Sequence, residues 1–186
     1  MSSQRYPSRL ESRPEPLRYP RGSGRLLDAS SIAGTPALCL DDSAECIPGR
    51  GELVIKGDSR VCIIAVGQRV LPCAEAALLV AQKNSHLATV FDACWVKPLP
   101  EEQILALAAE NDALLLVEEN SLLGGFSSSV LELLADNDML NTIKVRRLGL
   151  PDRFIPHGPV RRLRDDVGLN VRGIAGALDE LFSQLG

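Results

Sequence analysis

Short apolar segments alternate with segments of helical spacing from residue 61 to the end of the chain, and this alternation constrains the fold more than any other feature. Apolar spacing predicts strands at 61–66, 87–92, 113–119 and 143–150. Between and after them it predicts helices at 70–83, within 97–111, at 125–136 and at 170–185. The segment 61–66 is wholly apolar, as in a strand covered on both faces, whereas 143–150 alternates enough to lie near an edge. The pattern predicts an α/β fold, a three-layer sandwich in which a mostly parallel sheet lies between helices.

Residues 1–50 differ in kind from the rest of the chain. They contain prolines at positions 7, 14, 16, 20, 36 and 48 and show no sustained periodicity. Because proline interrupts both helices and central strands, we interpret this segment as an extended arm or linker. The predicted division is therefore an arm at 1–50 and a folded domain at 51–186.

Charge, cysteine content and apolar run length limit the possible partners and the compartment of the protein. The formal net charge of −4 disfavours a nucleic-acid surface, because neutralising phosphates requires clustered Lys and Arg. Basic residues do gather at 5–25 and 161–164, where they can meet an acidic partner or form a solvated basic face, and we expect the second. The cysteines, an odd number of five without a CxxC pair, favour a reducing compartment, the cytoplasm or a plastid. No apolar run approaches the roughly 18 residues that a membrane span requires.

Candidate functional residues follow the predicted strands, where ligands bind in open parallel sheets. Gly67, Asp92, the Glu118-Glu119 pair and the Pro151-Asp152 pair all lie at such carboxyl ends. Neither a G-x-G-x-x-G dinucleotide fingerprint nor a phosphate-binding P-loop is present, which disfavours nucleotide binding.

The segment "VEENSLLGGF" combines two carboxylates with two glycines before a helix. Glu118 and Glu119 are adjacent on a strand, so they point to opposite faces and cannot share a proton. We expect one to accept hydrogen bonds from amides of the following loop and the other to be solvated or to bridge an interface, with catalysis as the alternative. Gly124 and Gly125 either present amides to an anion or let the helix begin close to a neighbouring segment.

The histidines and serines give little support for a metal site or a hydrolase. Neither His86 nor His157 has a Cys, Asp or His partner at ligand spacing, so no metal site is predicted. His157 remains a ligand candidate because it lies in a loop near Asp152. The serines at 127–129 lack the G-x-S-x-G context of a nucleophile.

Four motifs in a fixed order resemble a known family. They are "RYPRGSG" at 18–24, "FDACWVKPLPEEQI" at 91–104, "LLLVEENSLLGGFSSSV" at 114–130 and "LGLPDRFIPHG" at 148–158. Together they are similar to the end of the 1-deoxy-D-xylulose-5-phosphate synthase family, which belongs to the thiamine diphosphate-dependent transketolases. The resemblance covers about residues 17–186, and it implies a transketolase carboxyl-terminal domain preceded by the end of a pyrimidine-binding domain.

The resemblance also implies a role for the chain. In the family, the first two domains bind thiamine diphosphate and Mg²⁺, and the third chiefly packs the dimer. This chain is then expected to bind no cofactor alone and to supply no catalytic residue, while Arg21 would contact the phosphate of glyceraldehyde 3-phosphate. Its partners would be a second copy or the cofactor-binding domains of a synthase. Candidates for an interface or ligand edge are Glu118, Glu119, Gly124, Gly125, Phe126, Asp152 and His157.

Two alternatives share the expected fold. One is a stand-alone interaction module that binds an enzyme subunit without chemistry of its own. The other is the carboxyl-terminal domain of a 2-oxoacid dehydrogenase β subunit, which "YPRG" and "LPDRFIPHG" match less well.

Overall fold

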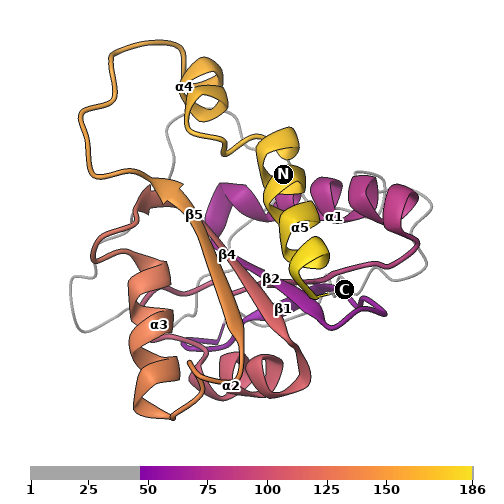
Figure 1. Ribbon diagram of the computed structural model, residues 1–186. Helices are drawn as coiled ribbons and strands as arrows, with labels where there is room; N and C mark the ends of the chain where they lie inside the picture. The colour runs from indigo at the N-terminus through magenta and orange to yellow at the C-terminus, as the bar shows by residue number, and fades with distance from the viewer. Residues whose placement is uncertain (1–46, 186) are drawn as a thin grey trace, which may run out of the picture.

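A computed structural model describes residues 47–185, which form a five-stranded sheet covered by helices on both faces (Figure 1). The strand order is β1-β3-β2-β4-β5, and every neighbouring pair is parallel except β1 with β3. The strands are β1 Glu52–Ile55, β2 Val61–Ala65, β3 Thr89–Asp92, β4 Ala113–Ser121 and β5 Lys144–Leu150. The predicted α/β class with a mostly parallel sheet is confirmed, as is the position of β5 at an edge.

The helices form the two outer layers. They are α1 Val70–Asn84, which follows a short 3-10 turn at Gly67–Arg69, then α2 Glu101–Glu110, α3 Phe126–Asp136, α4 Val160–Asp166 and α5 Val171–Leu185. Figure 1 shows α1 and α5 on one face of the sheet and α2 and α3 on the other. None of the helices within residues 47–185 is long and apolar enough to cross a membrane.

The central strand β2 shows why an uninterrupted apolar segment is needed between the two layers. Val61, Ile63 and Ala65 pack into the core cluster under α1 and α5. Cys62 and Ile64 point the other way and pack with residues of α2 and α3. Because successive side chains of a strand face opposite sides, a strand covered on both sides must be apolar at every position.

Sequence spacing does not predict β1 and α4. The strand β1 has four residues, pairs antiparallel with β3 and shifts register after Leu53, so it carries little periodic signal. The helix α4 buries none of its residues, so hydrophobic spacing gives no sign of it. Residues 1–46, which hold Arg21 and most of the predicted arm, lie outside the described part of the chain.

Candidate functional site

Glu118 organises the start of α3 from inside the domain. Its side chain is fully buried, and its two carboxylate oxygens accept hydrogen bonds from the backbone N–H groups of Phe126 and Ser127, each at 2.8 Å. These amides belong to the first turn of α3, where backbone N–H groups lack partners within the helix and the helix dipole favours negative charge. The expectation that one carboxylate of the pair accepts hydrogen bonds from following amides is confirmed.

The two glycines before α3 serve different needs. A Cβ at Gly125 would lie 2.1 Å from the carbonyl oxygen of Ser121 and 2.4 Å from a carboxylate oxygen of Glu118, so only a glycine fits this contact. Gly124 has open space around it but adopts a φ of +68°, a left-handed conformation that side chains disfavour. The anion held at this helix terminus is therefore the chain's own Glu118 carboxylate.

The structure corrects the predicted position of Phe126. Glu118, Gly124, Gly125 and Phe126 are predicted to lie at an interface or ligand edge, but Phe126 is 1% exposed and packs in the core beneath α2 and α3. Gly125 is also buried, whereas Gly124 and its neighbour Leu123 are exposed. Any contact surface at this turn must therefore use Leu123 and Gly124, because the other candidates are enclosed by their own domain.

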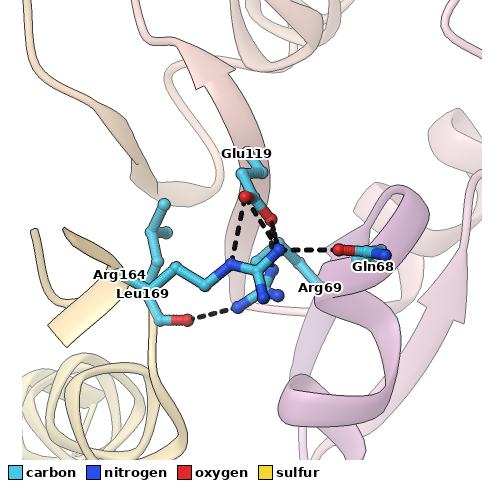
Figure 2. A network of polar contacts seen from close by, with 5 residues as sticks. All are labelled: Gln68, Arg69, Glu119, Arg164 and Leu169. Atoms are coloured by element: carbon cyan, nitrogen blue, oxygen red, sulfur yellow. Dashed lines mark hydrogen bonds and ion pairs between the residues drawn. The ribbon is translucent and has the colours of Figure 1, made fainter. Parts of the chain in front are cut away.

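Glu119 points to the opposite face and joins several segments of the chain (Figure 2). Arg164 of α4 binds it with two guanidinium nitrogens, Nε to Oε1 at 3.0 Å and Nη2 to Oε2 at 2.9 Å. Nη2 of Arg164 also donates to Oε1 of Gln68 at 2.6 Å. Glu119 thus bridges β4, α4 and the turn before α1.

Arg69 forms the buried side of the same cluster. Its Nε lies 3.1 Å from Oε2 of Glu119, an ion pair without a well-aligned hydrogen bond, and its Nη1 donates to the carbonyl oxygen of Leu169 at 2.7 Å. Burial lowers the pKa of Arg69, an effect that Glu119 opposes and that nearby Arg164 reinforces. Because both arginines depend on one carboxylate, removing Glu119 would leave a buried guanidinium without its counter-charge.

A pocket of 1120 Å³ opens beside this cluster, between the turn that leads into α1, helix α4 and the start of α5. We call it the arginine pocket, and the polar side chains around it are Gln68, Arg69, Asp92, Arg161, Arg164, Asp165, Asn170 and Arg172. Asp92 closes the β3 side: burial, reinforced by Glu52, raises its pKa from 3.8 to about 6, although the amide of Cys94 donates to it. The sequence predicts Asp92 and Gly67 at this edge, but its spacing does not indicate that Arg69 and Arg164 are partners of Glu119.

The loop at 151–159 holds the remaining candidates. Asp152 and His157 are both exposed, and neither lines the arginine pocket. The same loop carries Phe154, whose side chain is fully exposed. Within residues 47–185, no group of three or more His, Cys, Asp and Glu side chains is arranged to hold a metal ion.

Comparison with known proteins identifies the class of domain. Residues 49–174 match the family described as "Transketolase, C-terminal domain", and the chain belongs to this family. Among curated relatives, it is 49% identical over 174 residues to the 1-deoxy-D-xylulose-5-phosphate synthase of Nitratidesulfovibrio vulgaris (strain DP4), a match that covers 93% of this chain and 25% of the relative. It is 45% identical over 174 residues to 1-deoxy-D-xylulose-5-phosphate synthase 1 of Geobacter sulfurreducens, again with 93% and 25% coverage. The chain thus spans about a quarter of the length of these relatives.

Solved structures agree with the family assignment. A chain described as "Split gene transketolase, inactive beta4 tetramer" superposes with a TM-score of 0.67 and 28% identity, covering 79% of this chain and 46% of that one. The transketolase of Campylobacter jejuni superposes with a TM-score of 0.52 and 16% identity, covering 77% of this chain and 20% of that one, and it supports the fold alone. The predicted likeness to a transketolase carboxyl-terminal domain is confirmed.

Proposed function

We propose that the chain acts as the carboxyl-terminal domain of a 1-deoxy-D-xylulose-5-phosphate synthase, which condenses pyruvate with glyceraldehyde 3-phosphate and releases carbon dioxide. The observation that carries the proposal is the 49% identity to such a synthase over 93% of this chain. In this role the domain packs against the rest of the enzyme and does not perform the chemistry itself.

The geometry of the carboxylate pair supports a packing role. Glu118 is committed to the amides of α3, and Glu119 is committed to Arg69 and Arg164. A general acid or base must be free to reach a substrate proton, and both carboxylates are already paired with groups of their own domain. Both carboxylates therefore hold other segments of the domain in place near the end of β4.

The described residues do not fit thiamine diphosphate, whose diphosphate is held through a metal ion in this family. No suitable cluster of His, Cys, Asp or Glu side chains occurs within residues 47–185. We propose that the cofactor and Mg²⁺ are held by other domains, and that Arg21 contacts the substrate phosphate once those domains are present.

Two exposed loops form the proposed packing surface. The turn after β4 carries Leu123, which is 62% exposed, and the loop after β5 carries the fully exposed Phe154. The strands are neighbours, and the amide of Leu122 donates to the carbonyl oxygen of Leu150, so the two loops begin side by side. Exposed apolar side chains that lie together at one edge favour contact with another protein surface. Its partner would be a second copy or a cofactor-binding domain.

A domain exchange tests the catalytic assignment. The 174-residue segment of the Nitratidesulfovibrio vulgaris synthase that matches this chain is replaced by the corresponding segment of this chain, and carbon dioxide release from pyruvate and glyceraldehyde 3-phosphate is measured. We expect activity within about tenfold of the parent enzyme, which is a barrier change of at most ~1.4 kcal/mol. The matched control is the parent from which the same segment is deleted. A folded exchange protein that binds thiamine diphosphate but releases no carbon dioxide would refute the proposal.

The isolated chain provides an independent check. Titration calorimetry with thiamine diphosphate and Mg²⁺ should show no binding at about micromolar concentrations, where most specific cofactor sites are saturated. Binding in that range that depends on Mg²⁺ would place the cofactor site within this chain and would overturn the division of labour proposed here.

A stand-alone interaction module is the second candidate. It gains support from the solved relative described as an inactive tetramer, to which this chain is 28% identical. Substituting Leu123→Ser and Phe154→Ser should abolish self-association in sedimentation experiments without altering the circular dichroism spectrum. Leu79→Ser is the matched control, because Leu79 is an exposed leucine on α1, away from these loops. Self-association that persists in the double variant would exclude this surface.

A further inference from the structure

The charges around the arginine pocket are unbalanced. Four arginines line it, against two aspartates. Glu119 offsets part of the excess by pairing with Arg69 and Arg164 from beneath the pocket. A concave site with surplus positive charge concentrates anions, because its walls limit screening by water.

Two of the four arginines have no ionic partner within residues 47–185. Among residues 47–185, Arg161 and Arg172 make no ion pair and no side-chain hydrogen bond, although both border the pocket. They come from different elements, α4 and the first turn of α5, so an anion between them would be held from two sides. A guanidinium presents parallel N–H donors that match phosphate oxygens, which favours phosphate over a simple halide.

Helix polarity adds an independent argument. The first turn of α5 contains Arg172 and no acidic residue, so a cation lies at the positive end of the helix dipole, where it is unfavourable. The helix α1 begins at the pocket with no acidic residue in its first turn and no side-chain cap. At α3 the equivalent position is filled by Glu118. An external anion in the pocket would supply the charge that α1 lacks, whereas the start of α5 is capped by Asn170, whose Oδ1 accepts from the amide of Gly173 and whose side-chain amide donates to Asp165.

The position and size of the pocket point to an organic ligand. It lies beyond the carboxyl ends of β2 and β3, the edge at which open parallel sheets bind their ligands. Its 1120 Å³ exceeds the volume of a bare phosphate ion. Gly67 adopts a φ of +64°, and a Cβ at this position would have no atom within 4 Å, so the backbone is open there.

The arrangement of charges along the sheet orients the ligand. Asp92 ends β3, the turn with Gly67 follows β2, and Glu119 with its arginines ends β4, in the spatial order of the strands. A carboxylate repels phosphate but accepts hydrogen bonds from hydroxyl groups. We propose that the arginine pocket binds a phosphate monoester that carries hydroxyl groups, with the phosphate between Arg161 and Arg172 and the hydroxyl groups toward Asp92.

Calorimetry on the full chain tests the proposal with inorganic pyrophosphate and ribose 5-phosphate as probes, at constant ionic strength. We expect both to bind, and Arg161→Gln with Arg172→Gln to weaken both by about tenfold or more. The matched control is Arg153→Gln with Arg162→Gln, which removes the same charge from exposed arginines that do not line the pocket. We expect this control to change affinity by less than about twofold.

Asp92→Asn separates recognition of the hydroxyl groups from recognition of phosphate. The substitution should increase the affinity for pyrophosphate, because a negative charge is removed. The affinity for ribose 5-phosphate should increase less or should fall. Equal weakening by the two double variants would show nonspecific attraction and overturn the proposal. The proposal would also be overturned if neither pyrophosphate nor ribose 5-phosphate bound at about 10 mM.

Discussion

Replacing Glu118 by glutamine should strongly destabilise the domain, although the change removes no bulk. The carboxylate is fully buried and accepts from the amides of Phe126 and Ser127 at 2.8 Å each. A glutamine has one acceptor oxygen and one NH₂ group, so one of these amides would face another donor. The variant should lose one charge-assisted hydrogen bond and leave buried donors unpaired.

The magnitude follows from these two effects. A hydrogen bond to a charged group contributes about 1.5–3 kcal/mol, and an unsatisfied buried donor costs about 1–3 kcal/mol. We therefore expect Glu118→Gln to lower the free energy of unfolding by about 3–5 kcal/mol, a large part of the roughly 5–15 kcal/mol typical of a domain.

Urea unfolding followed by circular dichroism measures the difference. The matched control is Glu132→Gln, the same chemical change on the outer face of α3, which should alter stability by less than about 0.5 kcal/mol. If Glu118→Gln changed the unfolding free energy by less than about 1 kcal/mol, the reasoning about the buried carboxylate would be wrong.

Four further substitutions test other parts of the same edge. Gly125→Ala should lower the free energy of unfolding in urea by about 3 kcal/mol, because its Cβ would meet a backbone oxygen at 2.1 Å. Gly124→Ala, in open space at a φ of +68°, should lower it by about 1 kcal/mol. Equal losses for the two variants would contradict the close contact at Gly125. Burial raises the pKa of Asp92 from 3.8 to about 6, so the folded state binds protons more readily than the unfolded state between these values. Asp92→Asn should therefore stabilise the protein by up to about 3 kcal/mol above pH 6, and this gain should shrink as the pH falls toward 3.8; a constant gain would exclude titration of Asp92 as its source. Arg164→Ala should speed amide exchange throughout α4, which buries no residue, and unchanged exchange would show that other contacts hold the helix.

The sequence predicted the parts of the fold that depend on hydrophobic spacing. The strand β2 is apolar at every position because both of its faces are covered, and α5 repeats its apolar residues at helical intervals. The segment "VRRLRDD" that forms α4 offers no such signal. Arg164 holds this helix through Glu119, which is 45 positions away in the sequence, and such a nonlocal pair leaves no local pattern.

The carboxylate pair illustrates the same limit at the site. Strand geometry predicted that Glu118 and Glu119 face opposite ways, and the following loop predicted an amide partner for one of them. Which of the two turns inward depends on the register of β4 against its neighbours, which sequence spacing does not fix. The buried position of Phe126 depends on the same register, because its amide donates to the inward carboxylate.

The opposite orientations of Glu118 and Glu119 also explain why the edge of the sheet has two different sides. The inward carboxylate supplies the negative charge at the start of α3, so the glycine turn has no need of an external anion. The outward carboxylate binds arginines of two other segments, and its single charge cannot balance them together with Arg161 and Arg172. Since α1 and α5 begin on that side without acidic residues in their first turns, the unmet positive charge gathers in the pocket and not at the glycine pair, although the glycine pair is the more obvious anion motif in the sequence.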